Sequence, residues 1–265
     1  MFKEILVRMK QGHRTIRFPK AAPPALPDRF RGRPRIDAEK CGSSCHECAD
    51  ACPVAAIDAC TRAVDLGKCL FCTDCADACP EKAISFDNDY RLAASRRSDL
   101  LVGVGQLELV LATELDRRMK RLFGRSLKLR QVSAGGCNAC EADVNVLGTI
   151  GWDLGRFGIQ FVASPRHADG ILVTGPVTKN MELALKKTWD AVPDPKIVIA
   201  VGACAIAGGP YAGHEQVQGG VESLLPVDLY IPGCPPHPLT TLDGLLRLLG
   251  RMERRRDRKS VRAGS

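Results

Sequence analysis

The sequence is poor in aromatic residues and lacks an apolar run long enough to cross a membrane. Aromatic side chains make up 5% of the 265 residues, too few for a surface on which nucleic-acid bases stack. The longest apolar stretch, residues 100–113, is interrupted by Gln106 and Glu108 and is shorter than the roughly 20 residues that a transmembrane helix needs. Residues 1–20 contain no hydrophobic core of a secretory signal. We therefore expect no transmembrane segment, and we expect the thiols to stay reduced.

Motifs for nucleotide binding are also missing. Gly103 and Gly105 are not followed by a third glycine at dinucleotide spacing, and the lysine pattern of a P-loop does not occur. The five histidines form no pair at ligand spacing. These absences argue against binding of a nicotinamide cofactor or a nucleoside triphosphate.

Positive charge is concentrated at the two ends of the chain. Residues 1–40 hold 11 basic and 4 acidic side chains, and residues 251–265 hold 7 and 2, while the formal net charge of the whole chain is +8. We interpret the basic tail as a helix end that frays into solvent; a contact with an anionic membrane surface or an acidic neighbour is the alternative. The basic ends also suggest a zinc-stabilised nucleic-acid-binding protein, but the tail has no interleaved aromatics, so no nucleic acid is expected as a partner.

The length predicts about two domains, and the composition divides the chain further. Residues 1–40 begin with apolar side chains at helical spacing and continue into a proline-rich stretch, which predicts an amphipathic helix and an extended basic arm. The helix packs on the chain's own core or docks on a partner or membrane surface. Residues 41–97 contain a repeat, residues 98–126 are expected as a helical linker, and residues 127–250 form an α/β domain, before the basic tail 251–265.

The 13 cysteines are clustered, and the first group is an internal repeat. Cys45, Cys48 and Cys52 recur 27 residues later as Cys72, Cys75 and Cys79, and a proline follows the last cysteine of each copy. This spacing is that of a bacterial two-cluster ferredoxin, in which three thiolates of one loop bind one four-iron cluster and the cysteine before proline binds the other. The pattern predicts an N-terminal α+β ferredoxin domain. The predicted ligands are Cys41, Cys45, Cys48 and Cys79 for cluster one, and Cys69, Cys72, Cys75 and Cys52 for cluster two.

The metal bound by this repeat has an alternative interpretation. Two four-thiolate zinc sites also use paired C-x-x-C motifs, but they require neither the third cysteine nor the crossing one. The first copy has one extra residue between Cys41 and Cys45, so Cys41 departs from the usual pattern. We interpret Cys60 as a spare thiol and His46 as a solvated neighbour of the ligands.

From about residue 127, short apolar runs alternate with helical stretches. The runs cover residues 127–132, 159–163, 170–174, 196–201 and 228–231, and the expected helices cover residues 140–149, 181–191 and 241–256. Strands that alternate with helices predict a mainly parallel sheet covered on both faces. About four or five strands predict a flavodoxin-like, doubly wound α/β fold.

A second group of cysteines follows the ends of these predicted strands. Cys137 and Cys140 come after the first strand, and Cys204 and Cys234 come after two later strands. Glycine directly precedes Cys137 and Cys234, and one residue separates Cys204 from the glycine before it. The carboxyl ends of parallel strands meet at one edge, so these four thiols are expected to converge. They suit zinc or one four-iron cluster, or they are simply buried free cysteines.

Longer motifs around these cysteines resemble a known family. Gly135–Glu141, Ser164–Asp169, Thr174–Thr178 and Ile231–Pro236 are similar to the small subunit of membrane-bound, energy-converting nickel-iron hydrogenases of the formate hydrogenlyase and Ech types, and to its counterpart in respiratory complex I. The first hundred residues, with the run Gly32–Asp37, resemble the two-cluster ferredoxin subunit of those complexes. The two subunits are thus expected as a fusion in one chain.

The resemblance implies a third four-iron cluster and an electron-transfer function. Cys137, Cys140, Cys204 and Cys234 would bind that cluster, and the C-x-x-C spacing is the hydrogenase arrangement, whereas the complex I subunit has adjacent cysteines. The implied partners are a large subunit that carries the nickel site, other subunits of a membrane-bound complex, and a soluble electron donor or acceptor. The implied location is peripheral, on the cytoplasmic side of the membrane. A complex I-like enzyme that reduces quinone without nickel is the alternative.

Three other features are tied to this interpretation. No catalytic residue is expected in the chain itself. Glu141 is expected as a solvated carboxylate at a helix start, with cluster tuning or proton relay as the alternative. Arg166, His167 and the loop at Gly208–Tyr211 are candidates for the large-subunit interface.

Overall fold

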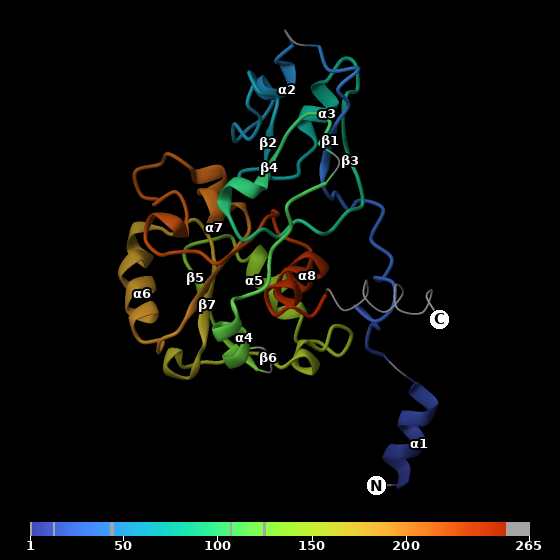
Figure 1. Cartoon of the computed structure of the whole chain (residues 1–265), viewed down its shortest axis with the longest axis vertical. Coiled ribbons are helices and arrows are strands. Elements are labelled where there is room, and N and C mark those ends of the chain that lie inside the picture. Colours follow the sequence, from blue (N-terminus) through green and yellow to red (C-terminus); the bar gives the residue numbers. More distant parts are fainter. Residues whose placement is uncertain (1, 13, 43–44, 107, 124–125, 253–265) are drawn as a thin grey trace.

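The computed structural model describes residues 2–12, 14–42, 45–106, 108–123 and 126–252. Its C-terminal part is built on a five-stranded parallel sheet of order β6-β5-β7-β8-β9 (Figure 1). The strands are β5 (Leu127–Ser133), β6 (Ile159–Phe161), β7 (Gly170–Thr174), β8 (Ile197–Val201) and β9 (Leu229–Ile231). In chain order this arrangement is 2-1-3-4-5, the flavodoxin-like order. The predicted five-stranded parallel sheet is confirmed.

Two layers of helices cover the sheet. The main helices are α5 (Ala139–Val146), α6 (Lys179–Asp190), α7 (Ala203–Ala207) and α8 (Pro238–Leu248). Side chains alternate across a strand: in β8, Ile197 and Ile199 pack in the cluster that holds the α5 and α8 side chains, whereas Val198 packs in the cluster of α6 and α7. All residues of β7 and β8 are buried, as expected for central parallel strands.

The N-terminal unit is smaller and antiparallel. β1 (Pro34–Ile36) pairs with β3 (Ile84–Phe86), and β2 (Val64–Asp65) pairs with β4 (Leu101–Val102). Two short helices, α2 (Glu47–Asp50) and α3 (Asp74–Ala78), each lie within one copy of the cysteine repeat. The unit joins the sheet at β9, because the backbones of Ala94 and Tyr230 exchange two hydrogen bonds, of 2.9 and 3.0 Å.

The region 98–126 differs from the helical linker that its apolar residues suggest. Its first residues complete a 3-10 turn, Arg97–Leu100, and form β4. Among its described residues, only α4 (Arg117–Phe123) is α-helical. β4 is the partner of β2, so the pairing of the N-terminal unit extends past residue 97. Leu109 and Leu115 pack against the two apolar clusters of the body. Leu101, Val110 and Leu122 are about half exposed.

In the described part of residues 1–40, α1 (Phe2–Gln11) is followed by a stretch that ends in β1, so the expected arm also contributes a strand to the N-terminal unit. Phe18 of the arm is 4% exposed and packs in the cluster of α5 and α8. At the other end of the chain, α8 stops at Leu248, and the part of the basic tail beyond residue 252 lies outside the described residues. No described helix has the length and apolar character that a membrane span requires.

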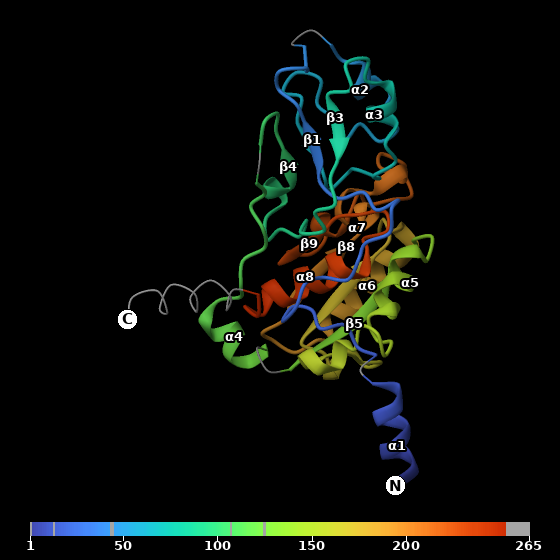
Figure 2. The same cartoon turned by 90° about the vertical axis from the view of Figure 1, so that its right-hand side faces the viewer.

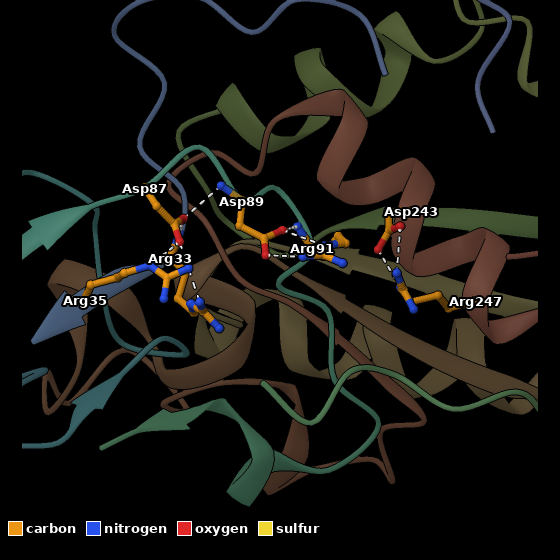
Figure 3. A network of polar contacts seen from close by, with 7 residues as sticks. All are labelled: Arg33, Arg35, Asp87, Asp89, Arg91, Asp243 and Arg247. Carbon is orange, nitrogen blue, oxygen red and sulfur yellow. Dashed lines mark hydrogen bonds and ion pairs between the residues drawn. The ribbon is translucent and has the colours of Figure 1, made fainter. Parts of the chain in front are cut away.

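A network of arginines and aspartates lies where the two units meet (Figure 3). Asp87 accepts a hydrogen bond from Arg35 Nε at 2.8 Å, and Asp89 accepts two from Arg91 at 2.8 and 2.6 Å. On α8, Asp243 is fully buried and accepts hydrogen bonds from Arg247 at 2.7 and 3.3 Å. Burial raises the pKa of Asp243, and Arg247 opposes this rise.

We expect Arg247→Ala to destabilise the protein, because it leaves a buried carboxylate without its cation. The loss in free energy of unfolding should be about 3 to 5 kcal/mol near neutral pH. Since the raised pKa of Asp243 lets it take up a proton in the folded state as pH falls, the deficit should shrink in acid.

Urea unfolding of both proteins near neutral and mildly acid pH measures this difference. Lys186→Ala is the matched control, because Lys186 makes the same i,i+4 type of ion pair with Glu182 on the exposed face of α6 and should leave the midpoint nearly unchanged. Equal effects of the two variants would contradict the assignment of Asp243 as a buried charge.

Candidate functional site

The structure brings together the four C-terminal cysteines at one edge of the sheet. Cys137 follows β5, Cys204 lies in α7 directly after β8, and Cys234 follows β9, so three loops meet where parallel strands end. Cys140 lies in the first turn of α5. Burial raises the pKa of Cys140, and Cys204, Glu141, Cys234 and Cys137 raise it further. Each of these charges therefore acts on the same thiol.

Glycine backbone is packed against these thiols. Gly202 has a φ of +90°, and a Cβ there would lie 2.6 Å from Cys140 Sγ. Gly209 has a φ of +56°, and its Cβ would lie 2.6 Å from Cys204 Sγ. Both positions thus exclude a side chain for conformational and for steric reasons. The backbone at both glycines therefore lies close to a thiol.

Glu141 is not solvated, contrary to the expectation from its place at a helix start. The residue is 7% exposed, and its Oε1 accepts hydrogen bonds of 2.6 Å from Ser133 Oγ and from Thr174 Oγ1. Burial raises the pKa of Glu141, but these hydrogen bonds outweigh it, and the net pKa is below the usual value.

The positions of the two hydroxyl residues that donate to Glu141 indicate a buried acceptor near them. Ser133 and Thr174 are the last residues of β5 and β7 and are register partners. Two hydroxyls at the ends of neighbouring strands mark the place where a buried acceptor is needed. The helix-start position of Glu141 alone did not reveal this.

The cysteines of the first repeat gather in crossed groups. Burial raises the pKa of Cys48, and Cys41, Cys45 and Cys79 raise it further. Burial raises the pKa of Cys69 to about 12, and Cys75, Cys52 and Cys72 also contribute. Each group therefore contains three thiols of one copy and the pre-proline thiol of the other. Despite the extra residue before Cys45, Cys41 lies with the first group.

Backbone N–H groups donate to several of these sulfurs. Ala56 N lies 3.2 Å from Cys52 Sγ, and Ala83 N lies 3.3 Å from Cys79 Sγ. These two contacts are at equivalent positions in the two copies of the repeat, because Cys79 and Ala83 lie 27 residues after Cys52 and Ala56. Hydrogen bonds to a ligating sulfur favour its thiolate form and influence reduction potential. The donor set therefore suits a cofactor that binds thiolates.

Thiols of the first and second groups share one packed region. Cys69 and Cys75 belong to a buried cluster, and Cys41, Cys48 and Cys52 pack against it. A cavity of about 420 Å³ is lined by both Cys72 and Cys234, together with Phe30 and His237.

Other candidates from the sequence lie outside these groups. Cys60 is exposed, and His46 Nε2 lies at the surface, 3.4 Å from Asp50 Oδ2. Within the described ranges, no group of three or more histidine, cysteine, aspartate or glutamate side chains is arranged to hold a metal ion. The thiolates of a four-iron cluster do not converge on a single ion, because each of them binds a separate iron atom.

The proposed interface residues are divided between two ends of the sheet. Arg166 and His167 lie in the 3-10 turn Pro165–His167, which leads to the amino end of β7. The thiols follow the carboxyl ends, so the structure does not bring these two residues to the thiols. The second candidate, the turn Gly209–Tyr211, lies beside Cys204, and Tyr211 is half exposed.

The C-terminal part is thus an α/β domain with four cysteines at the carboxyl edge of its parallel sheet. Residues 137–248 match the family described as NADH ubiquinone oxidoreductase, 20 kDa subunit. The chain belongs to this family of oxidoreductase subunits, since it is 39% identical to the probable membrane-bound hydrogenase subunit mbhJ of Pyrococcus furiosus over 52% of its own length and 84% of that protein.

Two further relatives show the range of the family. Formate hydrogenlyase subunit 7 of Escherichia coli is 45% identical over 49% of the chain, and this match spans about half (51%) of that relative. An NADH-quinone oxidoreductase subunit of Bacteroides thetaiotaomicron is 44% identical over 48% of the chain and 64% of that protein. The family match begins at residue 137 and does not reach the N-terminal cysteine repeat.

Proposed function

We propose that this chain is the electron-transfer subunit of a hydrogenase-type oxidoreductase complex. The observation that carries the proposal is that thiols from both parts of the chain adjoin: Cys72 of the repeat and Cys234 of the α/β domain line one cavity. That domain belongs to a family of oxidoreductase subunits. Four-iron clusters, when bound, would supply the one-electron redox chemistry. The chain's own residues supply thiolates, spacing and shielding from water.

Each group of residues has a distinct role in this proposal. The ligands of cluster one are Cys41, Cys45, Cys48 and Cys79; those of cluster two are Cys69, Cys72, Cys75 and Cys52; those of cluster three are Cys137, Cys140, Cys204 and Cys234. Ala56 and Ala83 donate backbone N–H groups to the crossing sulfurs. Gly202 and Gly209 allow backbone to close over the third group. Glu141 places a negative charge beside it.

We propose that the N-terminal unit is a fused two-cluster ferredoxin domain. The crossed groups and the two antiparallel strand pairs support this assignment. The proposed domain 41–97 extends further, because β2 inside it pairs with β4 beyond it. The unit then runs to about residue 105, where Gly105 N donates a hydrogen bond to Ile36 O of β1. Residues 1–40 serve as its arm, the segment to residue 126 connects it to the α/β domain 127–250, and residues 251–265 form the tail.

The partner at the third group is proposed to be a large subunit with a nickel-iron site. The C-x-x-C spacing of Cys137 and Cys140 and the similarity to two hydrogenase-linked proteins support it. The exposed N-terminal unit is the side for a soluble electron donor or acceptor. The complex would sit peripherally on the cytoplasmic face of the membrane. The second candidate is a quinone-reducing, complex I-like enzyme without nickel, which the similarity to an NADH-quinone oxidoreductase subunit favours.

We expect anaerobically purified protein to contain about twelve iron atoms and as much labile sulfide per chain, because twelve thiols divide into three groups of four. Cys137→Ser should remove about four of the iron atoms. Cys60→Ala is the control and should remove none, because Cys60 is exposed and outside the groups. Iron near eight in the unmodified chain would contradict the third cluster.

The glycine beside Cys140 allows a sharper test of the third group. Gly202→Ala places a methyl group 2.6 Å from Cys140 Sγ and should also lose about four iron atoms. Gly213→Ala is matched in backbone strain, since its φ is +82°, yet a Cβ there meets no atom within 4 Å. Iron and sulfide analysis of both variants separates crowding of the thiol from strain. Loss of iron in both would contradict the role of Gly202.

The partner is tested by co-purification of the tagged chain. We expect a large subunit with two C-x-x-C motifs that contains nickel, and we expect no hydrogen uptake or evolution by the isolated chain. Substitution of Tyr211 beside Cys204 should weaken the complex more than substitution of His167, because only Tyr211 lies at the thiol edge. A companion without those motifs would move the assignment to the quinone-reducing candidate.

A further inference from the structure

α1 presents an apolar stripe that no other described part of the chain covers. Phe2, Ile5, Leu6 and Met9 recur at helical spacing and are 82%, 53%, 58% and 75% exposed. No residue of α1 is buried. Single exposed apolar side chains are ordinary, but four along one stripe of a helix mark an interaction surface.

The stripe faces away from the body of the protein. A cavity beside α1 is lined by side chains of the helix and by Ile150, among others; those of the helix are Lys3, Glu4, Val7, Arg8 and Gln11. None of the four stripe residues lines this cavity. With 3.6 residues per turn, Glu4, Val7 and Gln11 lie on the side of α1 opposite the stripe, and Lys3 and Arg8 lie between that side and the stripe. The cavity therefore lies on the side of α1 away from the stripe.

Basic residues border the stripe on both sides. Lys3 and Lys10 lie next to one edge of it on the helical wheel, and Arg8 lies next to the other. The only acidic residue of α1, Glu4, lies on the opposite side. Residues 1–20 hold six basic side chains and one acidic side chain. An apolar stripe bordered by cations is the pattern of a helix that lies in a membrane interface, where long basic side chains reach the headgroups.

We propose that α1 binds the chain directly to an anionic phospholipid surface. The stripe enters the boundary between headgroups and acyl chains, and Lys3, Arg8 and Lys10 contact the phosphates. The apolar groove of a partner protein would cover the stripe equally well, but it does not account for cations along both of its borders. Figures 1 and 2 place α1 at the opposite end of the molecule from α2 and α3, so lipid contact at α1 leaves the N-terminal unit accessible to soluble proteins.

Sedimentation of the full-length chain with lipid vesicles tests the proposal without any partner subunit. Vesicles of phosphatidylcholine mixed with an equal part of phosphatidylglycerol should bind the chain, and pure phosphatidylcholine vesicles should bind it much less. Ile5→Ser with Leu6→Ser, and separately Lys3→Glu with Lys10→Glu, should each reduce binding about tenfold or more. Added salt should weaken binding, because the phosphate contacts are screened.

The control is Leu183→Ser, which removes an apolar side chain that is 63% exposed on α6 and should leave vesicle binding unchanged. Iron content and circular dichroism show that each variant is folded, which is expected because α1 contributes no buried residue. Absence of binding to the anionic vesicles overturns the proposal, as does binding that the α1 variants leave unchanged or that pure phosphatidylcholine supports equally. The result does not depend on the electron-transfer proposal, because vesicle binding is measured without the large subunit and without any redox reaction.

Discussion

The parallel direction of the five strands is the constraint on which the C-terminal site depends. Cys137, Cys204 and Cys234 are far apart in the sequence, yet they meet because β5, β8 and β9 all end at one edge of the sheet. An antiparallel strand in any of these positions would carry its loop to the opposite edge. The two apolar clusters on the faces of the sheet hold this arrangement, so the burial of β7 and β8 is indirectly what keeps the thiols together.

Assembly of the four thiols is costly without a ligand. Burial and mutual repulsion raise the pKa of Cys140 and Cys204, the latter to about 11, and a buried thiolate without a partner is unfavourable. The same argument holds for Cys69 and Cys75 in the N-terminal unit. Metal binding changes this balance, because a ligating sulfur exchanges its proton for a metal bond. The chain thus groups its cysteines in a way that favours occupancy by a thiolate-binding cofactor.

At the junction between the units, buried charges are likewise stabilised by a partner. Asp243 is enclosed in α8 and is held by Arg247, while Arg91 and Asp89 pair nearby (Figure 3). Charged groups are tolerated there because each meets an opposite charge. Cys72 and Cys234 are on different units and line one cavity, so the packing of the two units bears on the proposed electron path.

Local patterns in the sequence determined much of this protein. Strand positions and the parallel, flavodoxin-like class of the sheet follow from hydrophobic runs that alternate with helical stretches, because these are short-range signals. Tertiary structure alone decided the rest. It buried Glu141 under Ser133 and Thr174, paired β4 with β2 in a region expected to be helical, and placed His167 away from the thiol edge. In each case the outcome depends on which distant segment packs against the residue, and the residue's own neighbours in the chain do not encode that contact.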